Sequence, residues 1–182
     1  IIYIMSLLIT GGAGFIGKHI INKFINEFNI TTIDNLSSGY KENIPKNVNT
    51  IIGDCGDETV INNINQKYDA IIHIDAQSGG EGSFDNILYD FNSNLKSTVL
   101  LLELAKRINC KRFIFISTVA VYGGLEQTDS YSENDMLNPN TFYAVGKLSS
   151  EYYIKLYNKY YDINCTSFRL FNCYGPGQNL NN

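Results

Sequence analysis

The sequence has few features of a protein that binds nucleic acid or spans a membrane. It carries 14 lysine and arginine residues against 18 aspartate and glutamate residues, a formal net charge of -4, and its lysines are scattered. Nucleic-acid-binding proteins gather positive charge on one surface, so we expect no nucleic-acid partner. The apolar start, IIYIMSLLIT, is far shorter than the ~20 residues that span a bilayer, and it lacks the basic segment and cleavage site of a secretory signal. We therefore expect a first strand there and no membrane partner.

Cysteine pairs at metal-binding spacing are also missing. The four cysteines, Cys55, Cys110, Cys165 and Cys173, form no CxxC pair and are dispersed among apolar segments. This pattern favours buried, free thiols in a reducing compartment over disulfides or a zinc site. We therefore predict no metal site and a cytoplasmic location.

No low-complexity linker and no internal repeat divides the chain. With 182 residues, of which 44% are hydrophobic, it is long enough to bury one core, so we predict a single domain over residues 1–182. Residues 1–4 precede Met5, and we interpret them as translated upstream sequence rather than native protein.

Short apolar runs alternate with longer segments of helical spacing. Strands are predicted at residues 3–9, 30–33, 50–53, 69–74, 112–117 and 165–171, and helices at 15–28, 57–66, 92–109 and 143–161. Several of the strands are apolar at consecutive positions, as expected for strands buried on both faces. The alternation predicts an α/β fold, a doubly wound parallel sheet of the Rossmann type.

A glycine-rich turn, TGGAGFIG, follows the first predicted strand directly. It places Gly11, Gly14 and Gly17 at three-residue spacing where the first helix opens, which suits the close approach of backbone to a pyrophosphate. Taken alone, the motif could also be a tight turn with close helix packing. Asp34, which lies 20 residues beyond Gly14 at the end of the second strand, favours a dinucleotide site because its carboxylate can bind ribose hydroxyls. The same carboxylate would repel a 2'-phosphate, so we predict NAD rather than NADP.

Hydroxyl groups and a lysine follow in the second half of the chain. Ser117 and Thr118 end the fifth predicted strand, where ligands of open α/β sheets bind, so we expect their hydroxyls to face the cofactor cleft. Tyr143 and Lys147 are one helical turn apart, so the ammonium group could lower the pKa of the phenol and make it a proton-transfer group. Taken alone, Tyr143 and Lys147 could also be an ordinary surface pair. Thr118 could also be a residue that only caps the strand.

Six motifs together resemble one protein family. TGGAGFIG, DNLSSG, GD, STVAVYG, YAVGK and RLFNCYGPGQ appear in an order and at spacings similar to the extended short-chain dehydrogenase/reductase family, in its NAD-dependent epimerase/dehydratase branch that acts on nucleotide sugars. The resemblance extends from Leu7 to Gln178. It implies NAD as the cofactor, a nucleotide sugar as the substrate, and catalysis by Thr118, Tyr143 and Lys147.

The resemblance also assigns the contacts of both ligands. With the glycine-rich turn, the predicted cofactor residues are Gly11, Gly14, Phe15, Ile16, Gly17, Asp34, Asn35, Asp54, Cys55, Ser93, Tyr143, Lys147 and Phe171. Thr118 and Asn172 are the predicted substrate contacts. Asp54 and Cys55 are assigned to the adenine, although a turn aspartate is the simpler interpretation of the GD motif alone.

The implied reaction is the inversion of a sugar carbon by hydride transfer. Tyr143 would take the proton of a sugar hydroxyl while NAD accepts the hydride from C4, and the 4-ketose would recover the hydride on its other face. Family 4,6-dehydratases carry an acidic pair where this chain has Val119 and Ala120, so a 4-epimerase is favoured.

Two departures from the family pattern keep alternatives open. Asp75 stands where a small apolar residue is usual, near the expected cofactor phosphates, and should weaken NAD binding by like-charge repulsion. The family's C-terminal substrate portion is missing or truncated. The alternatives are a truncated, non-catalytic NAD-binding module of the same family, or a nucleotide-sugar dehydratase or reductase. A homodimer is left open as the oligomeric state.

Overall fold

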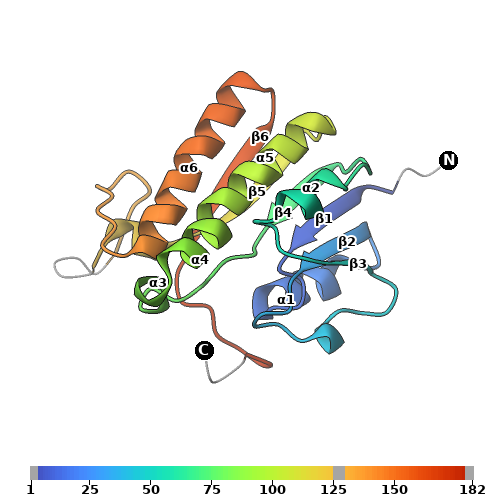
Figure 1. Ribbon diagram of the computed structural model, residues 1–182, viewed down its shortest axis with the longest axis horizontal. Coiled ribbons are helices and arrows are strands. Elements are labelled where there is room, and N and C mark those ends of the chain that lie inside the picture. The colour runs from blue at the N-terminus through green and yellow to red at the C-terminus, as the bar shows by residue number, and fades with distance from the viewer. Residues whose placement is uncertain (1–3, 125–129, 179–182) are drawn as a thin grey trace.

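Six parallel strands form the centre of the protein. The computed structural model describes residues 4–124 and 130–178, so residues 1–3 of the segment interpreted as non-native lie outside the described part. The sheet has the strand order β3-β2-β1-β4-β5-β6, and every neighbouring pair is parallel (Figure 1). The strands are β1 (Ser6–Thr10), β2 (Asn29–Asp34), β3 (Asn49–Ile52), β4 (Ala70–His73), β5 (Arg112–Thr118) and β6 (Asn164–Leu170). The predicted doubly wound parallel sheet is therefore confirmed.

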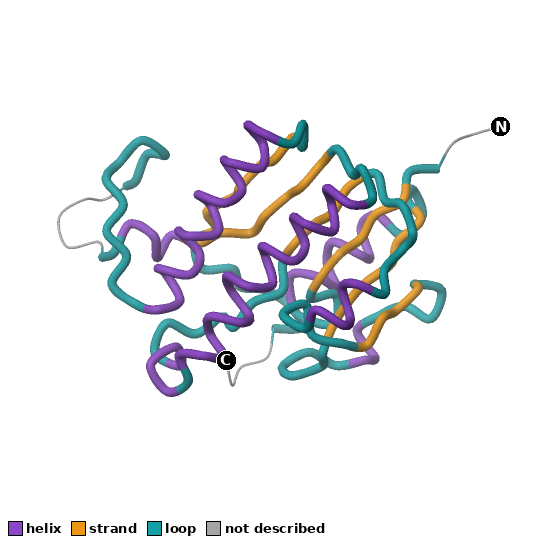
Figure 2. Tube along the Cα trace, turned by 45° about the horizontal axis from the view of Figure 1, so that its top comes forward, coloured by secondary structure: helices purple, strands orange, loops and turns teal. Residues whose placement is uncertain are grey.

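Helices cover both faces of this sheet, as the tube in Figure 2 also shows. They are α1 (Phe15–Phe24), α2 (Glu58–Asn62), α3 (Gly82–Asp85), α4 (Ile87–Phe91), α5 (Ser97–Arg107) and α6 (Phe142–Tyr160). Short 3-10 turns lie at η1 (Lys41–Asn43) and η3 (Val119–Tyr122), and a π-helical turn at η2 (Asn92–Lys96). Within residues 4–124 and 130–178, no helix is both long and apolar enough to cross a bilayer.

The core is divided into two clusters by the sheet. Successive strand residues point to opposite faces, so Leu8 of β1 packs with α2, α5 and α6, while Leu7 and Ile9 pack with α1 through Ile21. All four of these side chains are buried. Because both faces are covered, the one edge left for a ligand is where the carboxyl ends of the strands meet.

The predicted helices differ from the observed ones mainly between residues 74 and 107. The segment predicted as one helix over 92–109 consists of the π-helical turn η2 followed by α5, and the short helices α3 and α4 precede it where no helix was predicted. Asn86 is the N-cap of α4, and its side-chain oxygen accepts a hydrogen bond from Tyr89 N. Helix α2 ends at Asn62, four residues before its predicted end.

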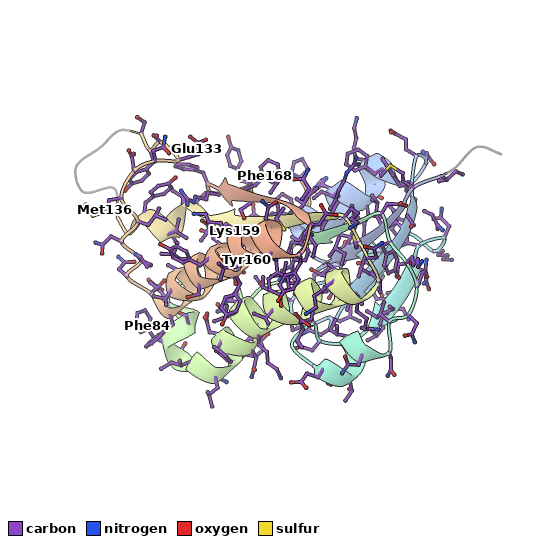
Figure 3. The ribbon with its side chains drawn as sticks, turned by 90° about the horizontal axis from the view of Figure 1, so that it is seen from above. Phe84, Glu133, Met136, Lys159, Tyr160 and Phe168 are labelled. Carbon is purple, nitrogen blue, oxygen red and sulfur yellow. The ribbon has the colours of Figure 1, made fainter. Side chains whose placement is uncertain are left out.

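A buried ion pair fastens α6 to β6. Arg169 Nη2 lies 2.7 Å from Glu151 Oε2, and the two side chains are 15% and 4% exposed. Ser117 of β5 donates a hydrogen bond of 2.6 Å to Glu151 Oε1. One carboxylate therefore holds helix α6 against the last two strands of the sheet. Figure 3 shows α6 beside β6, with Lys159 and Tyr160 labelled on α6 and Phe168 on β6.

Replacing Glu151 with alanine should lower the free energy of unfolding by about 3–5 kcal/mol, because it leaves the guanidinium group of Arg169 without its buried partner. Urea unfolding measures this loss. Lys111→Ala, which removes the exposed pair with Asp162, is the control and should change stability little. Equal losses in the two variants would contradict a structural role for the buried pair.

Candidate functional site

A cavity of about 1190 Å³ lies at the carboxyl ends of the strands. It is lined by the turn after β1, by the ends of β2 and β5, by the segment after β4, by the start of α6 and by the C-terminal segment. Twelve of the predicted site residues line it, namely Gly11, Gly14, Phe15, Ile16, Gly17, Asp34, Asn35, Thr118, Tyr143, Lys147, Phe171 and Asn172. Segments far apart in the sequence therefore meet at one site.

The glycine-rich turn depends on missing side chains at two positions. Gly11 has a φ of 72°, a left-handed conformation that favours glycine. A Cβ atom on Gly17 would lie 2.0 Å from Gly11 O, so only glycine lets α1 approach the turn this closely. Gly14, which has no side chain to offer, is the N-cap of α1. The first N–H groups of α1 are thus left for an anion in the cavity.

Asp34 lines the cavity and also fixes the turn. Its Oδ2 accepts a hydrogen bond of 2.8 Å from Ala13 N, and its Oδ1 accepts one of 2.8 Å from Leu36 N. Asn43 holds the same turn from the other side, because its Nδ2 donates a 2.7 Å hydrogen bond to Ala13 O. Each oxygen of the Asp34 carboxylate still has a lone pair that can accept a bond from a ligand hydroxyl.

Three predicted cofactor residues, all within the described part of the chain, do not line the cavity: Asp54, Cys55 and Ser93. Asp54 Oδ2 accepts a 3.0 Å hydrogen bond from Asn35 Nδ2, and its Oδ1 accepts one of 2.7 Å from Gly56 N. Cys55 is fully buried, and burial raises the pKa of its thiol. Ser93 is 8% exposed at the start of the π-helical turn. Their assignment to the cofactor stays a prediction.

The start of helix α6 brings the predicted catalytic residues together. Thr141 is the N-cap of α6, and its Oγ1 accepts a 3.1 Å hydrogen bond from Ala144 N, which places Tyr143 in the first turn. The Thr118 side chain lies close enough to the Tyr143 hydroxyl to lower the pKa of the phenol. Lys147, one turn later, is 2% exposed, and its Nζ donates a 2.9 Å hydrogen bond to Ile116 O.

Burial shifts the pKa values of both Tyr143 and Lys147. Burial raises the pKa of the Tyr143 phenol, and the Asp90 carboxylate raises it further, against a lowering by the hydrogen bond from Thr118. Burial also lowers the pKa of Lys147 to about 8, although Asp75 and Asp90 favour its charged form. The prediction of a Tyr143 phenol with a lowered pKa is therefore wrong for the chain without ligands, because burial dominates and raises that pKa.

The two hydroxyls at the end of β5 have different environments. Ser117 lines the cavity, as expected, but it is 3% exposed and its hydroxyl donates its hydrogen bond to Glu151, so this hydroxyl is bonded within the protein. Thr118 does face the cavity, and its Oγ1 also accepts a 3.2 Å hydrogen bond from Ala120 N.

Asp75 lies directly beside the glycine-rich turn. A Cβ atom on Gly11 would be only 3.0 Å from Asp75 N, and Asp75 itself lines the cavity. Its carboxylate is hydrogen-bonded to the Cys55 thiol. Burial, together with the charges of Asp34 and Asp54, raises the pKa of Asp75 to about 6.

Several cavity residues were not predicted from the sequence. They include Ser37, Ser38, Tyr40, Asn43, Ser78, Thr141, Tyr174 and Gln178. The N-cap Thr141 has a local signal, a threonine just before a helical segment. Tyr174 and Gln178 belong to the RLFNCYGPGQ motif, but their place at the cavity depends on contacts with distant α1. Lys18 Nζ donates a 3.0 Å hydrogen bond to Gly177 O, and His19 Nε2 lies 3.2 Å from Pro176 O. Figure 1 shows this segment returning from β6 toward α1.

Each of the four cysteines, all within the described residues, is free, as predicted. Cys55 and Cys110 are buried, Cys165 is partly buried, and Cys173 is exposed on the segment that lines the cavity. The expectation of burial is therefore wrong for Cys173, because it lies in the irregular segment after β6 and not in the strand.

Known proteins match both the sequence and the fold. A "Putative UDP-glucose 4-epimerase" of Methanocaldococcus jannaschii is 35% identical over 174 residues, which cover 94% of this chain and 57% of that protein. A "dTDP-D-glucose 4,6-dehydratase" of Dictyostelium discoideum is 31% identical and covers 97% of this chain and 46% of that protein. The crystal structure of the UDP-glucose 4-epimerase of Thermus thermophilus in complex with NAD has a TM-score of 0.92 and 31% identity, over 96% of this chain and 58% of that chain.

The chain thus spans about half the length of the relatives it matches. The family model described as "NAD dependent epimerase/dehydratase family" matches residues 7–182. This match covers the glycine-rich turn, the end of β5 and the start of α6. The chain therefore belongs to the NAD dependent epimerase/dehydratase family, whose cofactor is NAD.

Proposed function

We propose that this chain is the NAD-binding and catalytic part of a nucleotide-sugar 4-epimerase. The observation that carries the proposal is the position of Thr118, Tyr143 and Lys147 on the same cavity as the glycine-rich turn. Relatives named as UDP-glucose 4-epimerases, one of them solved with UDP-glucose at a TM-score of 0.92, support it. The substrate is a nucleotide sugar, and the rest of its binding site belongs to the part of the relatives that this chain does not span.

The residues of the cavity fit NAD. The turn at Gly11 and Gly17 leaves room for backbone to approach a pyrophosphate, and the N-terminus of α1 points there with its uncapped N–H groups. Asp34 presents free lone pairs to ribose hydroxyls and a negative charge that disfavours a 2'-phosphate. Bound NAD supplies the hydride acceptor and donor of the reaction.

Tyr143 is the proposed acid and base. Its hydroxyl lies near Thr118 on the same cavity, so both groups can hold one oxygen atom of a substrate alcohol between them. Since burial raises the pKa of the phenol in the chain alone, ionisation of Tyr143 requires added positive charge nearby. Lys147, whose pKa is about 8, supplies part of it and keeps two N–H donors beyond its bond to Ile116 O for ribose hydroxyls.

The residues after Thr118 favour epimerisation over dehydration. Val119 and Ala120 line the cavity and carry no group that can transfer a proton. Elimination of water from a sugar needs a further acid and base after the oxidation, whereas removal and return of a hydride at one carbon needs only Tyr143. We therefore favour 4-epimerase over a dehydratase or reductase.

Replacement of Tyr143 by phenylalanine should lower kcat by roughly 10²–10⁴-fold, because it removes the proton-transfer group and keeps the ring. The variant is made in a protein that carries a family substrate portion after residue 182, and turnover of a nucleotide sugar is measured together with NAD affinity. Tyr152→Phe, an exposed tyrosine on the same helix, is the control and should be fully active. Near-normal turnover by a folded Tyr143→Phe protein would remove Tyr143 from the chemistry.

The preference for NAD over NADP should fall by about tenfold or more in Asp34→Ala, because the variant loses hydrogen bonds to ribose and the charge that repels a 2'-phosphate. The readout is the ratio of the two dissociation constants, which stays informative even if the loss of the bond to Ala13 N loosens the turn. Asp85→Ala, at the exposed end of α3, should leave the ratio unchanged. An unmutated chain that binds NADP more tightly than NAD would contradict the proposal.

A further inference from the structure

Three carboxylates lie at the carboxyl ends of three different strands, and two of them, Asp34 and Asp75, line the cavity. Asp34 ends β2, Asp54 follows β3, and Asp75 follows β4, and the charges of the first two raise the pKa of the third. The Cys55 thiol is hydrogen-bonded to Asp75, and Lys147 of α6 is the cation that faces it. Among residues 4–124 and 130–178, no group of three His, Cys, Asp or Glu side chains is arranged to hold a metal ion. Protonation of Asp75 would remove one of these three negative charges and relieve the repulsion.

Asp75 is held in place and cannot easily withdraw. Its backbone N and that of Ile74 each donate a 3.1 Å hydrogen bond to Thr10 Oγ1 at the end of β1. Thr10 Oγ1 lies 2.8 Å from Nδ1 of His73, which is fully buried. The main chain of Asp75 thus packs against Gly11, at the turn that suits a pyrophosphate. An anion bound at this turn would lie in the cavity that Asp75 also lines.

We propose that Asp75 is a proton-coupled cofactor-binding residue, so that the dinucleotide binds together with one proton taken from solvent onto the Asp75 carboxyl group. The proton returns to solvent when the dinucleotide leaves, so no other reactant is consumed. A protonated Asp75 no longer repels the pyrophosphate and can donate a hydrogen bond to one of its oxygens. This inference rests on the proposed NAD site.

The direction of the pH dependence follows from the charges. The pKa of Asp75 is about 6 in the chain alone, and the negative pyrophosphate raises it in the complex. A pKa that rises on binding means that affinity is greatest below the pKa of the free chain and falls as pH rises toward the pKa of the complex. Each unit by which the pKa rises corresponds to a tenfold loss of affinity over this window.

Calorimetric titration of the chain with NAD between pH 5.5 and 8.5 tests the coupling. Near pH 7, titrations in two buffers of different ionisation enthalpy give the number of protons taken up, and we expect about one half to one proton. Between pH 6 and pH 8 we expect the affinity for NAD to fall by about tenfold or more. Asp75→Asn should abolish both effects and bind NAD more tightly than the unmutated chain at pH 8. Asp75→Ala should behave in the same way, which covers the case in which one variant fails to fold.

Asp85→Asn, an exposed carboxylate outside the cavity lining, is the matched control and should keep the full proton uptake. NAD binding without proton uptake in the unmutated chain, or an uptake that persists in the Asp75 variants, would overturn the inference and leave the NAD site standing. Absence of NAD binding by the chain and its Asp75 variants at every pH would instead overturn the proposed cofactor site, and this inference with it.

Discussion

The buried ammonium group of Lys147 is the interaction on which the rest of the site depends. Taking a cation out of water is costly unless it is hydrogen-bonded or paired, and the lowered pKa of about 8 reflects that cost. The ammonium group is bonded to Ile116 O, lies 4.7 Å from the centre of the Phe115 ring, and faces Asp75 and Asp90. It therefore ties the start of α6 to β5 and to the segments that flank β4.

Lys147 links the part of the cavity at the start of α6 with the part beside the glycine-rich turn. Tyr143, the proposed acid and base, lies one turn before Lys147 on α6, and Asp75 lies beside the turn that suits a pyrophosphate. Charge on Lys147 favours the ionised forms of both groups. A change in the charge of Asp75 on cofactor binding would in turn alter the environment of Lys147, so binding and proton transfer share one electrostatic network.

Local sequence patterns were enough to predict the fold and many of the cavity residues that lie at the ends of its strands and helices. The apolar runs, the glycine-rich turn and the pair at Tyr143 and Lys147 depend on neighbours within one or two helical turns, and the structure brings them to one cavity. The doubly wound sheet follows from the alternation of strands and helices. The main error in the helices, at 92–109, arose where a π-helical turn precedes α5, a feature that periodicity does not reveal.

Contacts between distant residues account for what the sequence could not predict. The hydroxyl of Ser117, a residue that lines the cavity, is bonded within the protein because Glu151, 34 positions later, accepts its hydrogen bond. The raised pKa of Asp75 needs Asp34 and Asp54, which only the folded sheet brings near. The phenol of Tyr143 is less acidic than expected because burial outweighs the nearby cation, and burial at a given residue depends on the whole fold.

Hydride transfer at the C4 carbon of the sugar is the central claim, and an isotope label follows it directly. A nucleotide sugar deuterated at C4 is incubated with NAD and a protein that joins this chain to a family substrate portion, and the product is analysed by nuclear magnetic resonance. The account predicts a product of inverted configuration at C4 that keeps its deuterium there, since the same hydride is removed and returned. A product that lacks the C6 hydroxyl, or deuterium lost from C4 to solvent, would contradict it.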